Sequence, residues 1–112
     1  MTTDPKKDRR KFDRKITAVE LEMVLASRAI PMRVSTTDLS VGGCYIHTVY
    51  PFPIGTRVTI SIHIGKEKLP VQGIVKTCHQ SFGNGIQFLK MAPADRVKLE
   101  AFLEGESFFE NE

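Results

Sequence analysis

The chain has 112 residues, of which 41% are hydrophobic and 26% are charged, and its formal net charge is +3. This length predicts one domain, and the composition excludes a globally disordered chain. No run of 18 apolar residues occurs, so the sequence predicts no membrane-spanning helix. The first residues are polar and lack the apolar core of a secretory signal, which favours a cytoplasmic protein.

Residues 1–15 form a basic segment with almost no apolar side chains. They contain seven Lys or Arg against three Asp, a net charge of +4, whereas the remainder carries nine basic and ten acidic residues. Such a segment predicts a flexible arm, at least without a ligand. Its concentrated charge predicts an anionic partner: a phosphate, a nucleic acid or a membrane surface.

Between Ile16 and Met91 apolar and polar residues mostly alternate, which is typical of half-buried strands. The pattern predicts six short strands, near residues 19–25, 30–36, 44–49, 57–64, 69–75 and 86–88. Turns are expected at residues 41–43, 51–55, 65–66 and 83–85, where Gly and Pro gather. Six short strands with these turns predict a mainly β fold, a small antiparallel barrel or sandwich.

A helix is expected to begin at Pro93, since proline suits a first helical turn, and to end at Gly105. Its apolar side comprises Val97, Leu99, Phe102 and Leu103. The residues after it, 106–112, are acidic and contain two Phe. The predicted organisation is therefore a basic arm (1–15), a barrel with a helix (16–104) and an acidic tail (105–112).

Cys44 and Cys78 are too few for a disulfide framework, and both are expected to be ordinary strand residues. Cys44 lies three positions before His47, and this offset places the two side chains on opposite faces of a strand. No metal site is therefore expected. The sequence also shows no nucleophile with a neighbouring base, so we expect no enzymatic activity.

Two segments contain residues suited to an anionic nucleotide. In the arm, Arg10 and Arg14 lie four positions apart, and a guanidinium group can bind a phosphate or the O6 and N7 atoms of guanine through two hydrogen bonds. Taken alone, the arm could equally be a solvated basic tail.

The second segment runs from Thr37 to Gly43. An extended chain would place Asp38 and Ser40 on one face, where a carboxylate can accept hydrogen bonds from a guanine and a hydroxyl can donate to a phosphate. Gly42 and Gly43 permit a close approach of the backbone. The alternative is a local turn in which Asp38 and Ser40 bond only to nearby backbone.

Taken together, the two segments resemble the signature of the PilZ domain family: Arg-x-x-x-Arg, then Asp/Asn-x-Ser-x-x-Gly some 20–30 residues later. Arg10 and Arg14 fill the first half, and Asp38, Ser40 and Gly43 fill the second. Residues 85–88, Gly-Ile-Gln-Phe, resemble the strand that ends the barrel in this family. The resemblance covers about residues 8–104.

This resemblance implies a six-stranded antiparallel PilZ-type β-barrel with a C-terminal helix, which binds cyclic di-GMP on its outer surface. By the same resemblance, Arg10 and Arg14 contact guanine faces and phosphates. Asp38 reads a guanine edge, Ser40 a phosphate, and Gly43, with Gly42 beside it, permits approach. Arg9 precedes the first motif arginine, and a third guanidinium there favours a stacked pair of ligands. No cofactor is implied.

The predicted function is a cyclic di-GMP receptor whose arm changes conformation on binding and regulates an unidentified effector protein. The alternative is an adaptor of the same fold that docks on proteins without a ligand. A nucleic-acid binder is disfavoured because the barrel region is close to neutral. The sequence does not choose among motility, polysaccharide synthesis and transcription as the regulated process.

Overall fold

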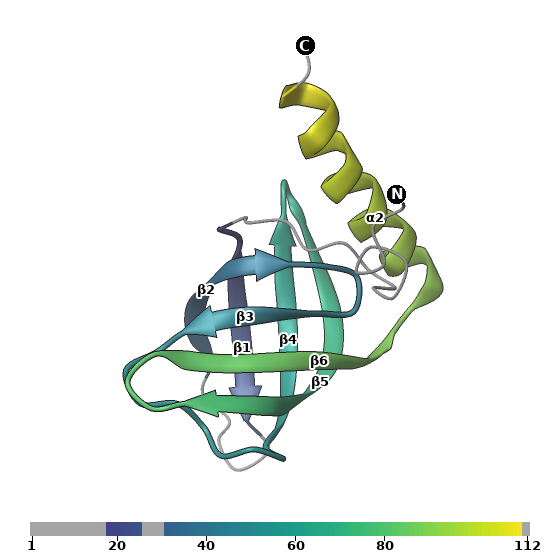
Figure 1. The fold of residues 1–112 in the computed structure, drawn as a ribbon. Coiled ribbons are helices and arrows are strands. Elements are labelled where there is room, and N and C mark those ends of the chain that lie inside the picture. The colour runs from purple at the N-terminus through teal and green to yellow at the C-terminus, as the bar shows by residue number, and fades with distance from the viewer. Residues whose placement is uncertain (1–17, 26–30, 111–112) are drawn as a thin grey trace, which may run out of the picture.

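The computed structural model describes residues 18–25 and 31–110, with side chains up to residue 105. It consists of six strands and one helix (Figure 1). The elements are β1 (Glu20–Leu25), β2 (Met32–Leu39), β3 (Gly43–His47), β4 (Arg57–Ile64), β5 (Glu67–His79), β6 (Gly83–Met91) and α2 (Pro93–Glu110). The predicted strands and the helix start are confirmed.

The six strands form a closed antiparallel barrel in the order β1-β2-β3-β6-β5-β4. Pairing of β1 with β4, for example Met23 with Ile60, closes the circle. Closure removes the unpaired edges that an open sheet would present to other chains. The predicted mainly β fold, a six-stranded antiparallel barrel with a C-terminal helix, is confirmed.

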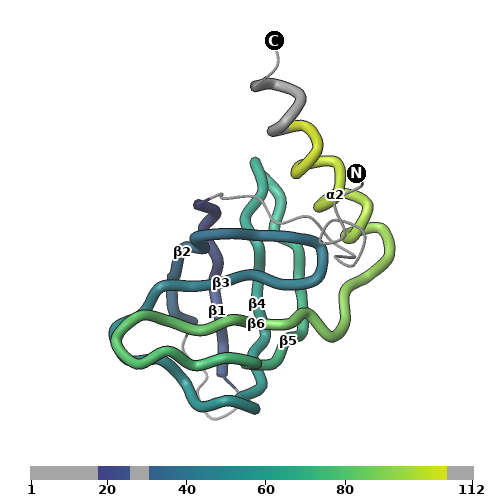
Figure 2. Tube along the Cα trace, in the orientation of Figure 1, coloured from purple at the N-terminus to yellow at the C-terminus, as the bar shows by residue number. Residues whose placement is uncertain are grey.

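The alternation in the sequence corresponds to the inside and outside of this barrel. Outside the bulges, the strands send every second side chain inward, so β1 buries Leu21 and Met23 and leaves Glu20 exposed. The inward side chains from all six strands form one hydrophobic core. Leu99 and Leu103 of α2 join this core, whereas the C-terminal part of the helix extends beyond the barrel (Figure 2).

Two predictions about glycines were wrong. Residues 83–85 were expected to form a turn, but they lie in β6, and the turn is at residues 80–82. A Cβ on Gly83 would collide with the backbone carbonyl of Ile46, so this glycine permits close strand packing instead of a turn. Gly105 was expected to end the helix, but α2 continues to Glu110, because glycine weakens a helix without forbidding it.

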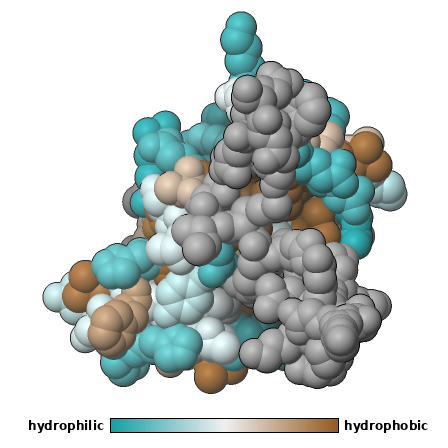
Figure 3. Space-filling view, turned by 45° about the horizontal axis from the view of Figure 1, so that its top comes forward, coloured by the Kyte–Doolittle hydropathy of each residue, from teal (hydrophilic) through white to brown (hydrophobic). Residues whose placement is uncertain are grey.

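Apolar and polar side chains are mixed on the face that Figure 3 shows, without one dominant apolar band. In the part of the chain that the structure describes, no helix is long and apolar enough to cross a membrane.

Candidate functional site

The structure describes one half of the predicted binding motif. Asp38, Ser40, Gly42 and Gly43 lie together where β2 turns into β3. Arg9, Arg10 and Arg14 lie outside the described residues, so their predicted roles stay predictions.

Asp38 is directed to the outer wall by a β-bulge. Thr36 pairs with Ile46 and Asp38 pairs with Tyr45, so Thr37 is an extra residue in β2. Thr36 and Leu39 are both buried, although they are three residues apart. A regular strand with Thr36 inside would also place Asp38 inside. The bulge shifts the alternation by one, and the half-buried Asp38 shares the outer face with its partner Tyr45.

Ser40 lies in the turn after β2, and its hydroxyl stabilises that turn through two hydrogen bonds. The side chain is 3% exposed. Its Oγ donates to the Gly43 carbonyl at 3.3 Å and accepts from the Gly42 N–H at 3.1 Å. This arrangement is the local turn that the sequence left open as an alternative for Ser40. A phosphate would have to replace the Gly43 carbonyl as the acceptor of the Ser40 hydroxyl.

Gly43 is required by strand packing. A Cβ at this position would collide with the backbone carbonyl of Ile86 on β6. The carbonyl of Gly42, one residue earlier, accepts the N–H of Phe88 at 2.9 Å, which ties the turn to the same strand. Gly43 therefore allows the β2–β3 turn to pack closely against β6, independently of any ligand.

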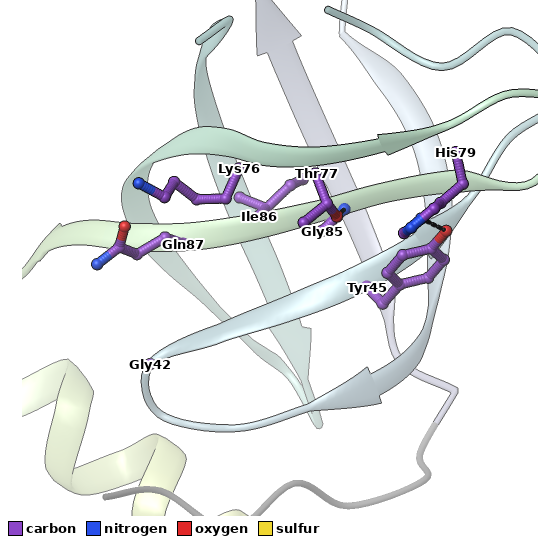
Figure 4. A pocket seen from close by; sticks show the side chains of 8 residues that line it. All are labelled: Gly42, Tyr45, Lys76, Thr77, His79, Gly85, Ile86 and Gln87. Carbon is purple, nitrogen blue, oxygen red and sulfur yellow. Dashed lines mark hydrogen bonds between the residues drawn. The ribbon is translucent and has the colours of Figure 1, made fainter. Parts of the chain in front are cut away.

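An open hollow of about 370 Å³ adjoins this corner on the outer wall (Figure 4). It is lined by Gly42, Tyr45, Lys76, Thr77, His79, Gly85, Ile86 and Gln87. The volume lies within the range of small-molecule sites. The hollow exists partly because β6 presents a glycine, Gly85, between the larger side chains of β3 and β5.

The two ends of the hollow differ in chemistry. At one end the Tyr45 hydroxyl lies 2.8 Å from His79 Nδ1, and the two rings are tilted at 37° (Figure 4). At the other end Lys76 and Gln87 lie near each other (Figure 4). A second bulge, between Val75 and Thr77, makes Lys76 an extra residue in β5. The hollow therefore offers an aromatic wall, an amide and a cation, and among the described residues no carboxylate lines it.

Sequence reasoning did not assign Tyr45, Lys76, His79 or Gln87 to the site. The signal that could have revealed the hollow is the pair of glycines at positions 83 and 85 within an apolar strand, since isolated strand glycines mark close approach. The sequence contains no comparable signal for the bulge that exposes Lys76.

Cys44 and His47 lie on β3, three positions apart. Cys44 is buried in the core and His47 is exposed, so their side chains leave opposite faces of β3. Neither Cys44 nor Cys78 forms a disulfide. Among the described residues, no group of three or more His, Cys, Asp or Glu is arranged to hold a metal ion.

The fold and the site define a small antiparallel barrel that presents its candidate binding groups on the outer wall. The model of the PilZ domain family matches residues 8–105. The chain belongs to the PilZ domain family, as its motifs suggested. No curated protein matches the chain.

Solved structures share this fold at low sequence identity. The PilZ domain of YcgR from Escherichia coli, solved with c-di-GMP, has a TM-score of 0.71 and 17% identity, with 92% of this chain and 95% of that chain covered. The Bacillus subtilis inhibitor of motility, MotI/DgrA, has a TM-score of 0.79 and 13% identity over 93% of this chain. The match spans 54% of the Bacillus chain, about half its length.

A third similar structure is the PilZ domain of CeSA from a cellulose-synthesizing bacterium, with a TM-score of 0.66 and 18% identity. The match covers 85% of this chain and 98% of that chain. At these identities the likeness establishes the fold alone.

Proposed function

We propose that this chain is a non-catalytic receptor module that binds cyclic di-GMP on the outer wall of its barrel. The observation that carries the proposal is the position of Asp38, which the bulge at Thr37 holds outside, opposite Tyr45 and beside the hollow. Support also comes from the intact family signature and from related barrels solved with c-di-GMP.

In this proposal Asp38 accepts hydrogen bonds from the N1–H and N2–H groups of one guanine. Lys76 approaches a phosphate from the far end of the hollow, and Gln87 offers amide groups that match a base edge. Arg9, Arg10 and Arg14 close over the ligand from the arm. The order that the arm gains costs conformational entropy, which charge-assisted hydrogen bonds to the phosphates offset.

An effector protein would then distinguish the bound from the free receptor, because ligand binding changes how the arm lies against the barrel. A cytoplasmic location fits this role, since we expect the ligand and the effector there. Arg9, which precedes the first motif arginine, supports a stacked pair of ligands with its guanidinium on the second guanine.

Calorimetric titration with cyclic di-GMP tests the proposal. Binding is expected, and Asp38→Ala should weaken it by about 1–3 kcal/mol, the cost of losing a charged hydrogen bond. Glu20→Ala is the matched control, because it removes an exposed carboxylate from β1 and should bind normally. No heat from the unaltered protein would refute the receptor and leave the ligand-independent adaptor.

Two further variants separate the parts of the site. Lys76→Ala should lower both the affinity and its dependence on salt, since a phosphate contact would be lost. Lys66→Ala removes an exposed cation at the β4–β5 turn, remote from the hollow, and should change neither. A stoichiometry of two ligands per chain that falls to one in Arg9→Ala would support the stacked pair.

A further inference from the structure

A group of exposed apolar side chains lies at the end of the barrel where β3 leads to β4 and β5 turns into β6. Val49, Tyr50 and Phe82 are 57%, 84% and 65% exposed. We call these three residues the end patch. Single exposed apolar residues are common, but neighbouring ones mark a surface that another molecule covers.

Hydrogen bonds hold the end patch in a fixed shape. The N–H of Thr48 donates to the carbonyl of Phe82 at 2.9 Å, which joins the two loops that carry the patch. The turn itself is closed by the N–H of Phe82, which donates to the carbonyl of His79. A surface that is already ordered loses little conformational entropy on binding, which favours association.

Below the end patch, the fully buried Asn84 braces the first loop. Its Oδ1 accepts the N–H of Phe52 at 2.8 Å, and its Nδ2 donates to the Phe52 carbonyl at 2.9 Å. The same Nδ2 donates to the carbonyl of Thr77 at 3.1 Å. The loop that presents Val49 and Tyr50 is therefore fastened to the barrel interior.

The charges around the end patch indicate which kind of partner it would bind. The segments 47–57 and 77–82, which form this end, contain Arg57 and two His but no Asp or Glu. Carboxylates of the described residues lie elsewhere, on β1, β2, the first residue of β5 and α2. The patch therefore fits an acidic segment with large apolar side chains.

The chain itself contains such a segment. Residues 104–112 have the sequence Glu-Gly-Glu-Ser-Phe-Phe-Glu-Asn-Glu, with four carboxylates and two aromatic rings. Helix α2 leaves the barrel at the opposite end, where Lys98 Nζ bonds Glu67 Oε1 at 2.8 Å (Figure 1). The eight residues of β4 separate the two ends by about 23 Å. The helix points away from the patch, so the segment reaches only a patch on another molecule (Figure 1).

We propose that the end patch binds the C-terminal segment, residues 104–112, of a second copy of this chain. Phe108 and Phe109 would cover Tyr50 and Phe82, and the glutamates would face Arg57 at the start of β4. Such a contact joins two different surfaces, so it is head-to-tail and builds dimers and longer chains as the concentration rises. The proposal does not depend on nucleotide binding.

Sedimentation velocity over a range of protein concentrations tests this contact in the full chain. The mean mass should rise with concentration, and Phe82→Ser or removal of residues 106–112 should keep the protein monomeric. Leu89→Ser is the matched control, because Leu89 is 46% exposed on β6 outside the end patch and should associate normally. Since Phe82 and Leu89 are exposed, neither serine variant should change the melting temperature.

A labelled peptide of residues 104–112 provides a second measurement, with the chain that lacks residues 106–112 as receptor. Fluorescence anisotropy should show binding that weakens in high salt and falls at least about tenfold with Phe82→Ser or with both peptide Phe changed to Ser. A protein that stays monomeric and does not bind the peptide overturns the proposal. Association that Phe82→Ser leaves unchanged also overturns it.

Discussion

Asp38 and Tyr45 are direct partners across the β2–β3 ladder, and the extra residue Thr37 makes this pairing compatible with a buried Leu39. The pairing joins the acidic residue of the family motif to the aromatic wall of the hollow. Tyr45 lines the hollow together with Lys76 of β5, so a carboxylate, an aromatic ring and a cation from three strands lie on the outer wall.

Deletion of Thr37 should be tolerated, because it restores a regular strand without turning any inward side chain outward. Thr36 and Leu39 would stay inside and Asp38 outside. We expect a loss of about 1–2 kcal/mol in urea unfolding, in the ordinary range for single changes. Deletion of Thr59 is the contrast: β4 has no bulge, so a slip of one residue moves its core side chains outward, and this variant should not fold.

Replacement of Gly43 by Ala should destabilise the barrel by about 1–3 kcal/mol, because the new methyl group collides with the rigid Ile86 carbonyl. Gly105→Ala is the matched control in α2, where a Cβ meets nothing within 4 Å. That change should stabilise the protein by about 0.5–1 kcal/mol, since alanine is the better helix former. Denaturant unfolding measures both, and equal effects would refute the packing role of Gly43.

Asn84→Ala should destabilise the protein by about 2–4 kcal/mol, because it removes three hydrogen bonds of a fully buried side chain and takes these partners from backbone groups of Phe52 and Thr77. Hydrogen exchange should show faster opening of residues 48–56 in this variant. Gln80→Ala, an exposed change in the neighbouring turn, should leave both measurements unchanged. Unaltered exchange in Asn84→Ala would contradict the bracing role.

The contact between α2 and the start of β5 should weaken as the solution becomes alkaline. The hydrogen bond and the charge of Glu67 raise the pKa of Lys98 above the ordinary lysine value. A raised pKa in the folded state means that the stabilisation is complete below the unfolded pKa and is lost as the pH rises through the folded one. Both side chains are about half exposed, so the effect is small.

The measurement compares thermal melting of the unaltered protein and Glu67→Gln at neutral and alkaline pH. The two proteins should differ slightly at neutral pH and converge at alkaline pH, where Lys98 loses its charge. Gln72→Glu, an exposed change on β5, tests whether any altered surface charge gives the same result. A difference that persists at alkaline pH would show that the ion pair is not its cause.

Local sequence determined the elements of this protein because their signals are local. Alternating apolar residues define strands such as β4, and Pro93 marks the start of α2. The motif residues Asp38 and Gly43 were also visible, because the family signature has fixed spacing. These elements and motif residues can be recognised without knowing which distant strands lie beside them.

Only the tertiary structure decided where the side chains of the site lie. Gly83 and Gly85 looked like turn residues, yet they serve close strand packing, because each faces atoms from another strand. The bulges at Thr37 and Lys76 arise from pairing between strands, and they set which side chains leave the barrel wall. Strand register depends on closing the whole barrel, so a short window of sequence does not contain it.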